Sequence, residues 1–239
     1  MIPTLNAMGH MFAHTDPFTQ DFITYAIAHC QRVADIGPAF GIASLPVVNA
    51  GVETTVIDLD QGHLDYIQSH TAPDMRKFLH SYVGHFPQTV TLPLNTFGAI
   101  IVSRILHFFD VDSMVFALAH LYDALLPGGR LYFISTTPFI KIYESFIPVY
   151  LARRSNQVQW PGVMNNIHEY APHRAHQLPS YINLMDLPEA KSLLTRLDFK
   201  IIRSGYIPSP HGQFDISLDG REHIGIVAEK PRIQQKNNF

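Results

Sequence analysis

The hydrophobic pattern alternates between two kinds of segment along most of the chain. Short runs of apolar and β-branched residues, typical of buried strands, occupy residues 32–36, 53–59, 97–103 and 130–135. Apolar residues at helical spacing lie between these runs, near residues 40–49, 61–70 and 111–126. Strands that alternate with helices predict a parallel α/β sheet with right-handed crossovers. Residues 75–86 fit either a helix or a helix that leads into a short strand ending at Val83.

A helix precedes this alternation. Residues 16–30 show a helical stripe, and Asp16 followed by Pro17 is typical of a helix start. We therefore expect an N-terminal helical segment over residues 1–31. The last part of the chain returns to a helix and two strands, at residues 187–197, 199–206 and 223–228.

Residues 136–183 interrupt the pattern with aromatic residues and prolines. We interpret them as an insertion within a single domain that covers residues 1–239. Some of its apolar residues have helical spacing, namely Phe139, Ile142, Tyr143, Phe146 and Tyr150. That spacing fits packing against the sheet and a substrate lid equally well.

Composition narrows the function classes. Hydrophobic residues make up 46% of the chain and charged residues 15%, so the chain can bury a substantial core. The net charge is −3 and no basic stripe is present, so we expect no nucleic-acid partner. Cys30 is the only cysteine, which excludes an internal disulfide and fits a reducing compartment. We find neither a signal peptide nor an apolar membrane-spanning segment, and we expect a cytoplasmic protein without membrane association.

The first strand ends in a loop of small residues, Asp35-Ile36-Gly37-Pro38-Ala39-Phe40-Gly41. A strand that passes through such a loop into a helix places backbone N–H groups and a positive dipole end beside a ligand. The spacing differs from the dinucleotide-binding G-x-G-x-x-G, because Ile42 occupies the last position. Asp35 would also repel a pyrophosphate. The loop therefore favours a cationic or amino-acid-like ligand.

Four motifs in order resemble those of the class I S-adenosylmethionine-dependent methyltransferases. They are the loop, Asp58 at the end of the second strand, the apolar run over residues 97–109, and Leu125-Leu126-Pro127-Gly128-Gly129-Arg130-Leu131. The resemblance implies a Rossmann-like methyltransferase fold. Such a fold has a seven-stranded, mostly parallel sheet with an antiparallel last strand and helices on both faces.

The resemblance also implies S-adenosyl-L-methionine as cofactor and assigns residues to it. The methionine part would be held by the loop residues Asp35, Gly37, Pro38, Ala39 and Gly41, and by Ser103. Asp58, followed by Leu59, would bind the ribose hydroxyls. The adenine would contact His85 and Phe86, or Gln88 in a second register. Ala39 replaces a family glycine, a change that is tolerated unless this residue requires a positive φ.

Methyl transfer to a small-molecule acceptor is the function that this resemblance favours. We expect Tyr25, His107 and Tyr143 to contact the acceptor, with Phe18 and Phe22 beside Tyr25. His107 fits a general base or a packing residue, and no catalytic residue is assigned, because methyl transfer depends mainly on alignment and exclusion of water.

Other interpretations remain open at this point. They are a methyltransferase of RNA or protein, and a methyltransferase-like binding protein without activity. His168, His173 and His176 lie in a proline-containing stretch without regular spacing, so we predict no metal site. The oligomeric state is left open, a homodimer included.

Overall fold

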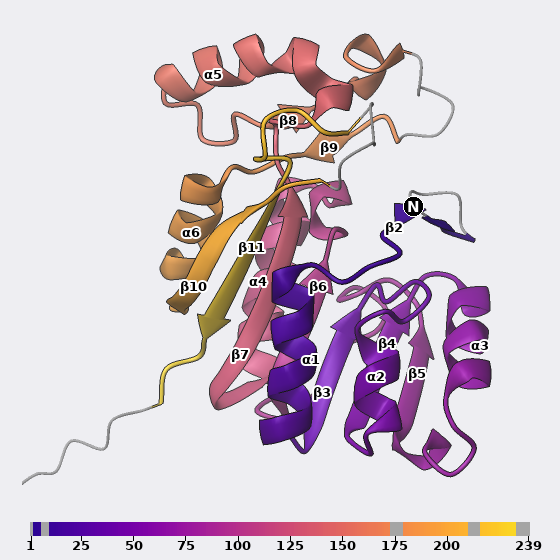
Figure 1. Cartoon of the computed structure of the whole chain (residues 1–239). Coiled ribbons are helices and arrows are strands. Elements are labelled where there is room, and N and C mark those ends of the chain that lie inside the picture. Colours follow the sequence, from indigo (N-terminus) through magenta and orange to yellow (C-terminus); the bar gives the residue numbers. More distant parts are fainter. Residues whose placement is uncertain (1, 6–9, 173–178, 210–215, 233–239) are drawn as a thin grey trace, which may run out of the picture.

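A seven-stranded sheet organises the molecule (Figure 1). The computed structural model describes residues 2–5, 10–172, 179–209 and 216–232. In the sheet order β10-β11-β7-β6-β3-β4-β5, the strands β3 to β7 are parallel, and β11 pairs antiparallel with both β7 and β10. The strands are β3 (Arg32–Ile36), β4 (Glu53–Asp58), β5 (Leu79–Val83), β6 (Phe97–Ser103), β7 (Leu125–Thr136), β10 (Lys200–Ile207) and β11 (His223–Glu229). The predicted fold class, with its antiparallel last strand, is confirmed.

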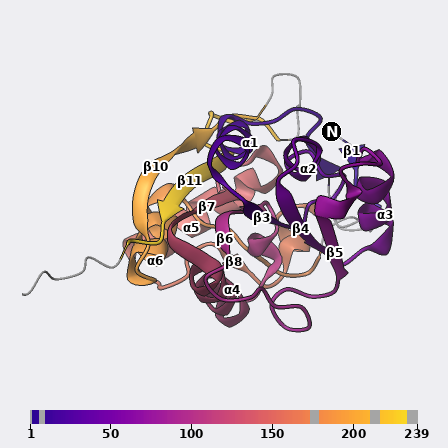
Figure 2. The ribbon, with the colours of Figure 1, turned by 90° about the horizontal axis from the view of Figure 1, so that it is seen from below.

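Helices cover both faces of the sheet (Figure 2). One face packs against α1 (Pro17–His29) and α2 (Ser44–Asn49), and the other packs against α4 (Val111–Ala124) and α6 (Leu187–Arg196). A further helix, α3 (Gln61–His70), packs on β4 and β5. This arrangement explains why the strands read as continuous apolar runs, because a strand covered on both faces exposes no polar side.

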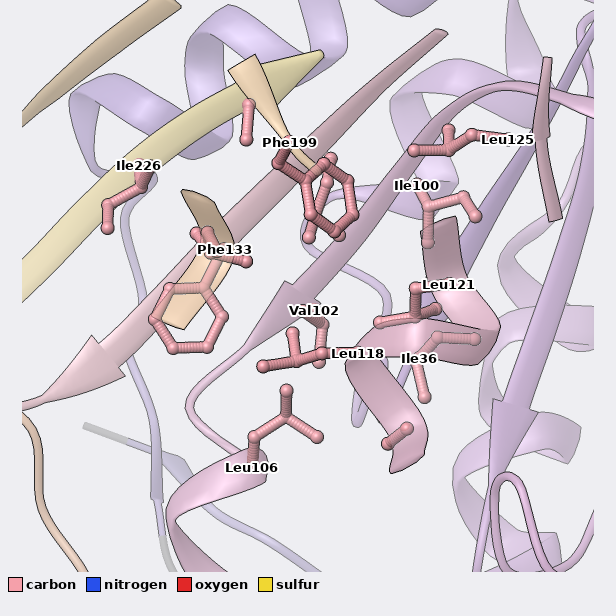
Figure 3. Packing of buried hydrophobic residues seen from close by; sticks show 14 of the residues in the cluster. Ile36, Ile100, Val102, Leu106, Leu118, Leu121, Leu125, Phe133, Phe199 and Ile226 are labelled. Carbon is pink, nitrogen blue, oxygen red and sulfur yellow. The ribbon is translucent and has the colours of Figure 1, made fainter. Parts of the chain in front are cut away.

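The strand β6 shows how the core is divided. Ala99 and Ile101 point to the α1 face, whereas Ile100 and Val102 point to the α4 face, as the two-residue period of a strand requires. Figure 3 shows Ile100 and Val102 among the side chains of α4 and β7. Both are fully buried, and burial of each such side chain contributes roughly 1.5–3 kcal/mol to stability.

Aspartates start four of these helices, α1, α3, α4 and, with Asp186, α6. Asp16 accepts hydrogen bonds from the amides of Phe18 and Thr19 at 2.9 and 3.0 Å, which confirms the predicted start of α1. Asp60 caps α3 and Asp110 caps α4 in the same way. Each cap satisfies amides that have no partner within the helix, and it typically contributes about 1 kcal/mol.

Of two segments before the insertion, one differs from the prediction and the other settles an alternative that the sequence left open. The helix predicted from residue 40 begins at Ser44, because residues 39–43 form the turn that leaves the loop. Residues 75–86 form a short 3₁₀ turn (Arg76–Phe78) followed by β5, which matches the second of the two predicted forms.

The insertion lies above the carboxyl ends of β7 and β6 (Figure 1). Its apolar stripe is divided between a 3₁₀ segment (Lys141–Phe146) and α5 (Ile147–Ser155), with Tyr143 in a non-helical conformation. Two short strands, β8 (Val163–Met164) and β9 (Ile182–Asn183), pair within the insertion, where little strand structure was expected. The stripe residues pack in a separate cluster with residues that include Met164, Ile167, Ile182 and Leu184.

The N-terminal segment is not entirely helical. Before α1, the strands β1 (Ile2–Pro3) and β2 (His10–Met11) form a small antiparallel sheet. Over the described ranges, no helix is long and apolar enough to cross a membrane.

Candidate functional site

The carboxyl ends of the central parallel strands open into a cavity of about 800 Å³. Parallel strands bring the loops that follow them to one edge of the sheet, so motifs far apart in the sequence meet here. All predicted cofactor residues except Gly41 line the cavity: Asp35, Gly37, Pro38, Ala39, Asp58, Leu59, His85, Phe86 and Ser103. The N-terminal segment adds Met11, Phe12 and Asp16, and the insertion adds Ile140, Ile142 and Tyr143.

The loop after β3 owes its shape to left-handed backbone conformations. Gly37 and Gly41 have φ of 70° and 72°, a region that favours glycine. A Cβ atom on Gly37 would lie 2.6 Å from Ile105 Cγ2, and one on Gly41 would lie 2.9 Å from Ile67 Cγ1. The prediction that Gly41 contacts a ligand is therefore corrected, because Gly41 turns the chain and packs against α3 instead of lining the cavity.

Ala39 also has a positive φ, 47°, and its amide donates to Asp58 Oδ2 at 3.2 Å. A non-glycine residue in this region is strained by about 1 kcal/mol. A positive φ is the condition under which alanine in place of the family glycine is unfavourable.

Replacement of Ala39 by glycine is expected to raise the free energy of unfolding by about 0.5–1 kcal/mol, because the strain is relieved. Chemical denaturation measures the change. Ala50, an exposed residue with φ of −85°, serves as the control. Ala50→Gly relieves no strain and should lower stability by about 0.5 kcal/mol. A loss of stability in Ala39→Gly equal to that in Ala50→Gly would contradict the prediction.

The carboxylate of Asp58, at the end of β4, is held by two contacts. Asp58 Oδ1 accepts from the amide of Asp60 at 2.9 Å and lies 3.1 Å from His63 Nδ1. His63 Nε2 accepts from the amide of Leu5 at 3.0 Å, so in the neutral ring Nδ1 carries the proton and donates to Asp58. These contacts orient the Asp58 carboxylate at the cavity wall. Sequence reasoning missed His63, although its place in the first turn after Asp60 was a usable signal.

Asp35, near the end of β3, lines the same cavity and is 3% exposed. The pKa of Asp35 is raised to about 7, mainly by burial and to a smaller extent by the charge of Asp58, while Ser44 acts in the opposite direction. A cation bound in the cavity would oppose that shift by favouring the ionised carboxylate. The loop thus offers a negative group to a positively charged ligand.

The adenine-contact region follows β5. Gly84, His85, Phe86, Gln88 and Thr89 all line the cavity, so both predicted registers reach it. The His85 amide donates to Thr89 Oγ1 at 2.8 Å, which closes this turn on itself.

At the end of β6 lies Arg104, a residue that the sequence did not single out. Arg104 has a φ of 58° and lines the cavity. Its guanidinium contacts Asp16 Oδ2 at 3.2 Å and Ser103 Oγ at 3.1 Å, and lies 4.7 Å from the ring centroid of Phe12. His223, from β11, meets the edge of the same ring at 5.4 Å.

His107 stands next to this group and lines the cavity with 5% of its surface exposed. Its Nδ1 is enclosed and has no hydrogen-bond partner among the described residues. Burial lowers the pKa of His107 to about 3, and the positive charge of Arg104 contributes to the shift. The ring is therefore neutral near pH 7 and is a weak base.

Of the residues predicted to contact the acceptor, His107 and Tyr143 line the cavity and Tyr25 does not. The Tyr25 ring stacks on the Arg130 guanidinium at 4.1 Å, far along α1 from the cavity. Phe18 and Phe22 are buried between α1 and the sheet. Only the first turn of α1 reaches the cavity, so these three predictions are corrected.

Among the described residues, no group of three histidine, cysteine or acidic side chains is arranged to hold a metal ion. His173 and His176 lie outside the described residues.

Comparisons with known proteins agree with this geometry. Residues 34–133 match the family model described as a methyltransferase domain. No curated protein matches the sequence. Among solved structures, a Methanosarcina mazei S-adenosylmethionine-dependent methyltransferase matches 91% of this chain and 99% of its own, with 15% identity and a TM-score of 0.64.

Two further structures are similar. A Mesorhizobium loti S-adenosylmethionine-dependent methyltransferase matches 89% of this chain and 96% of its own, with 15% identity and a TM-score of 0.62. The Burkholderia thailandensis 1,6-didemethyltoxoflavin-N1-methyltransferase, solved with S-adenosylhomocysteine, matches 90% of this chain and 79% of its own, with 15% identity and a TM-score of 0.60. The methyltransferase-domain match over residues 34–133, the sheet order and the ordered motifs together support a class I S-adenosylmethionine-dependent methyltransferase.

Proposed function

We propose that the protein transfers the methyl group of S-adenosylmethionine to a small molecule bound in the same cavity. One observation carries the proposal: a single cavity extends from Asp58 and His85 to His107, His223 and Tyr143. Its volume of about 800 Å³ is at the upper end of the roughly 300–1,000 Å³ that ligand pockets occupy. It therefore has room for the cofactor and a small acceptor side by side.

The residues on the β3–β5 side fit the cofactor. Asp58 offers a carboxylate for the ribose hydroxyls, and Asp35 places negative charge near a cationic ligand. The glycine loop permits close approach of the backbone. When bound, the cofactor supplies an electrophilic methyl group on a sulfonium.

The insertion supports a small, moderately apolar acceptor. It contributes Ile140, Ile142 and Tyr143 to the cavity wall opposite the sheet, and all three are buried. Buried walls of this kind exclude water, and methyl transfer requires that exclusion. The Burkholderia thailandensis relative is a methyltransferase of a small heterocycle by its name, and an O-methyltransferase from Planctomyces limnophilus was solved with apigenin. Small-molecule acceptors thus occur on this fold.

The test uses the purified full chain with radioactive methyl-labelled S-adenosylmethionine. Low-mass metabolites, total RNA and total protein are offered separately as acceptors. Label in the low-mass fraction alone supports the proposal. Label in RNA or protein would favour a macromolecular substrate, and an absence of cofactor binding in calorimetry would favour a binding protein without activity.

Tyr143→Ala is expected to lower transfer to the low-mass fraction about tenfold, because a missing aromatic wall loosens the acceptor. Binding of S-adenosylhomocysteine should stay within about twofold of the wild-type value. Tyr82, an exposed tyrosine on β5 outside the cavity, provides the control Tyr82→Ala, which should change neither quantity. Equal transfer by the two variants would place the acceptor elsewhere.

A further inference from the structure

The cavity has two chemically different sides, separated by β6. The acids Asp35 and Asp58 lie at the ends of β3 and β4, on the cofactor side. Arg104 follows β6 and turns toward Asp16, Phe12 and His223, on the side of β7 and β11. We call Arg104, Asp16, His107 and His223 the acceptor-side cluster.

The Arg104 guanidinium is not saturated by its protein partners. Of its five N–H groups, three donate: Nη1 to Asp16 Oδ2 and Ser103 Oγ, and Nη2 to Asp16 Oδ2. Nε is enclosed and has no hydrogen-bond partner in the part of the chain that the structure describes. The ion pair uses a single carboxylate oxygen at 3.2–3.3 Å instead of the parallel two-oxygen geometry that arginine favours. One N–H of Nη2 therefore stays available beside the cavity.

Asp16 compensates the charge of Arg104 only in part, because Asp16 also serves the start of α1. Its Oδ1 accepts from the amides of Phe18 and Thr19, and its Oδ2 accepts from the Thr19 hydroxyl. The carboxylate thus faces both a guanidinium and the positive end of a helix dipole. The acceptor side keeps a positive character.

Neither histidine of the cluster supplies a strong base. His223 Nδ1 lies 3.4 Å from Thr136 Oγ1, and its Nε2 lies 3.3 Å from Ser209 Oγ. Burial and the charge of Arg104 lower the pKa of both His107 and His223. Both rings are neutral near pH 7, so neither would readily take a proton from a weakly acidic hydroxyl or ammonium group. An acceptor that arrives already ionised needs no such step.

The backbone of Arg104 supports a functional role. A bulky residue with φ of 58° is strained by about 1–2 kcal/mol, and such strain concentrates at ligand sites. From this turn after β6, the Arg104 side chain extends toward the start of α1, where it pairs with Asp16.

We propose that the acceptor is a small apolar carboxylic acid, and that Arg104 binds its carboxylate beside the methyl group that is transferred. This inference rests on the proposed function and deepens it. The apolar body of the acid would contact Phe12, Ile140 and Tyr143, which line the same part of the cavity.

The reaction balances without a proton transfer. A carboxylate oxygen forms a bond with the methyl carbon as the carbon–sulfur bond breaks, and the electron pair of that bond stays on the sulfur. The products are a neutral methyl ester and a neutral thioether. The negative charge of the acid and the positive charge of the sulfonium cancel. Arg104 holds the oxygen in line with the methyl carbon, as orientation-driven catalysis requires.

The binding experiment uses the full chain saturated with S-adenosylhomocysteine and three matched pairs of probes: benzoate and benzamide, cinnamate and cinnamamide, indole-3-acetate and indole-3-acetamide. Calorimetry is expected to show that at least one acid binds about tenfold or more tightly than its amide, because its charged group pairs with a guanidinium. Absence of that preference in all three pairs overturns the inference. Failure of S-adenosylhomocysteine itself to bind would instead overturn the proposed function.

Arg104→Met should abolish the preference for the acid, and Arg104→Lys should retain part of it. The matched control is Arg203→Met, because Arg203 also pairs with an aspartate of α1 (Asp21, 3.4 Å) and lies over a phenylalanine (Phe18, 4.5 Å), but outside the cavity. It should keep the wild-type preference. If Arg104→Met weakens S-adenosylhomocysteine binding about tenfold, Arg104 binds the cofactor and the inference is wrong.

Replacement of Asp16 distinguishes a ligand-binding role of Arg104 from a purely structural one. Asp16→Asn keeps a helix-capping side chain and removes the competing charge, so it should strengthen binding of the acid. If Arg104 only clamps Asp16, this variant should instead lose the preference, as Arg104→Met does, and the inference fails.

Product chemistry gives a second readout. Label transferred to the preferred acid should be released as volatile methanol in mild alkali, because a methyl ester hydrolyses there. Label that resists alkali would show transfer to another atom and would overturn the inference.

Discussion

Asp58→Asn is expected to weaken binding of S-adenosylmethionine and S-adenosylhomocysteine about ten- to hundredfold. The carboxylate is oriented by the Asp60 amide and by His63, and it faces the cavity. Hydrogen bonds to a charged group contribute about 1.5–3 kcal/mol, and each 1.4 kcal/mol is a tenfold change in affinity. Asparagine keeps the size of the side chain but removes the charge and one acceptor oxygen. Titration calorimetry measures the change for both ligands.

The control for this prediction is Asp65→Asn in α3, the helix that follows Asp58 in the chain. Asp65 is exposed and accepts a hydrogen bond from Gln61 at 2.8 Å, away from the cavity. Its replacement should leave both affinities within about twofold. An Asp58→Asn protein that behaved like this control would show that the ribose is bound by other groups.

The second large effect concerns the pH dependence of Asp35. The pKa of an aspartate is near 3.8 when unfolded, and burial raises it to about 7 in the folded protein. The folded state therefore holds this proton more tightly. The stabilisation is fully present below about pH 4 and is lost as pH rises through about 7, with a total on the order of 4 kcal/mol.

Asp35→Asn removes this dependence. Compared with the wild type, its free energy of unfolding should rise progressively between about pH 4 and pH 8, since asparagine is never ionised. Denaturant unfolding at several pH values measures the difference. A wild-type-minus-variant difference that stays constant over this range would contradict the assignment of the pKa to Asp35.

Cofactor binding should be linked to the same proton. A cationic ligand favours the ionised form of Asp35, so binding at about pH 6 is expected to release close to one proton. Calorimetry in buffers of different ionisation enthalpy counts that proton. Asp35→Asn should show no release. Equal proton counts for the two proteins would mean that another group titrates.

The sequence predicted much of the fold and of the cofactor side because these features are local. Asp35 and Asp58 each end a buried apolar run, and the parallel sheet delivers the ends of such runs to one edge. Ser103 ends β6 and His107 lies in the turn after it, so both come to the same edge of the sheet. No long-range information was needed to expect these four residues around a common cavity, which all four line.

Conformation and packing decided what the pattern left open. The composition of the loop does not reveal that Ala39 has a positive φ, since most alanines do not. Helical spacing suggested that Tyr25 faces the acceptor, but the tilt of α1 against the sheet brings only its first turn to the cavity. The pair β8–β9 joins two-residue segments, which are too short to show strand periodicity.

The sequence by itself determined the alternation of strands and helices, the methyltransferase motifs and most of the residues that line the cavity at the ends of β3, β4 and β5, because each depends on a short stretch of chain. Only the tertiary structure brought together the cluster around Arg104. Arg104 meets Asp16 across 88 positions, and His223 joins them from the last strand. Such contacts depend on how the sheet is ordered and how α1 packs on it, which no local pattern specifies.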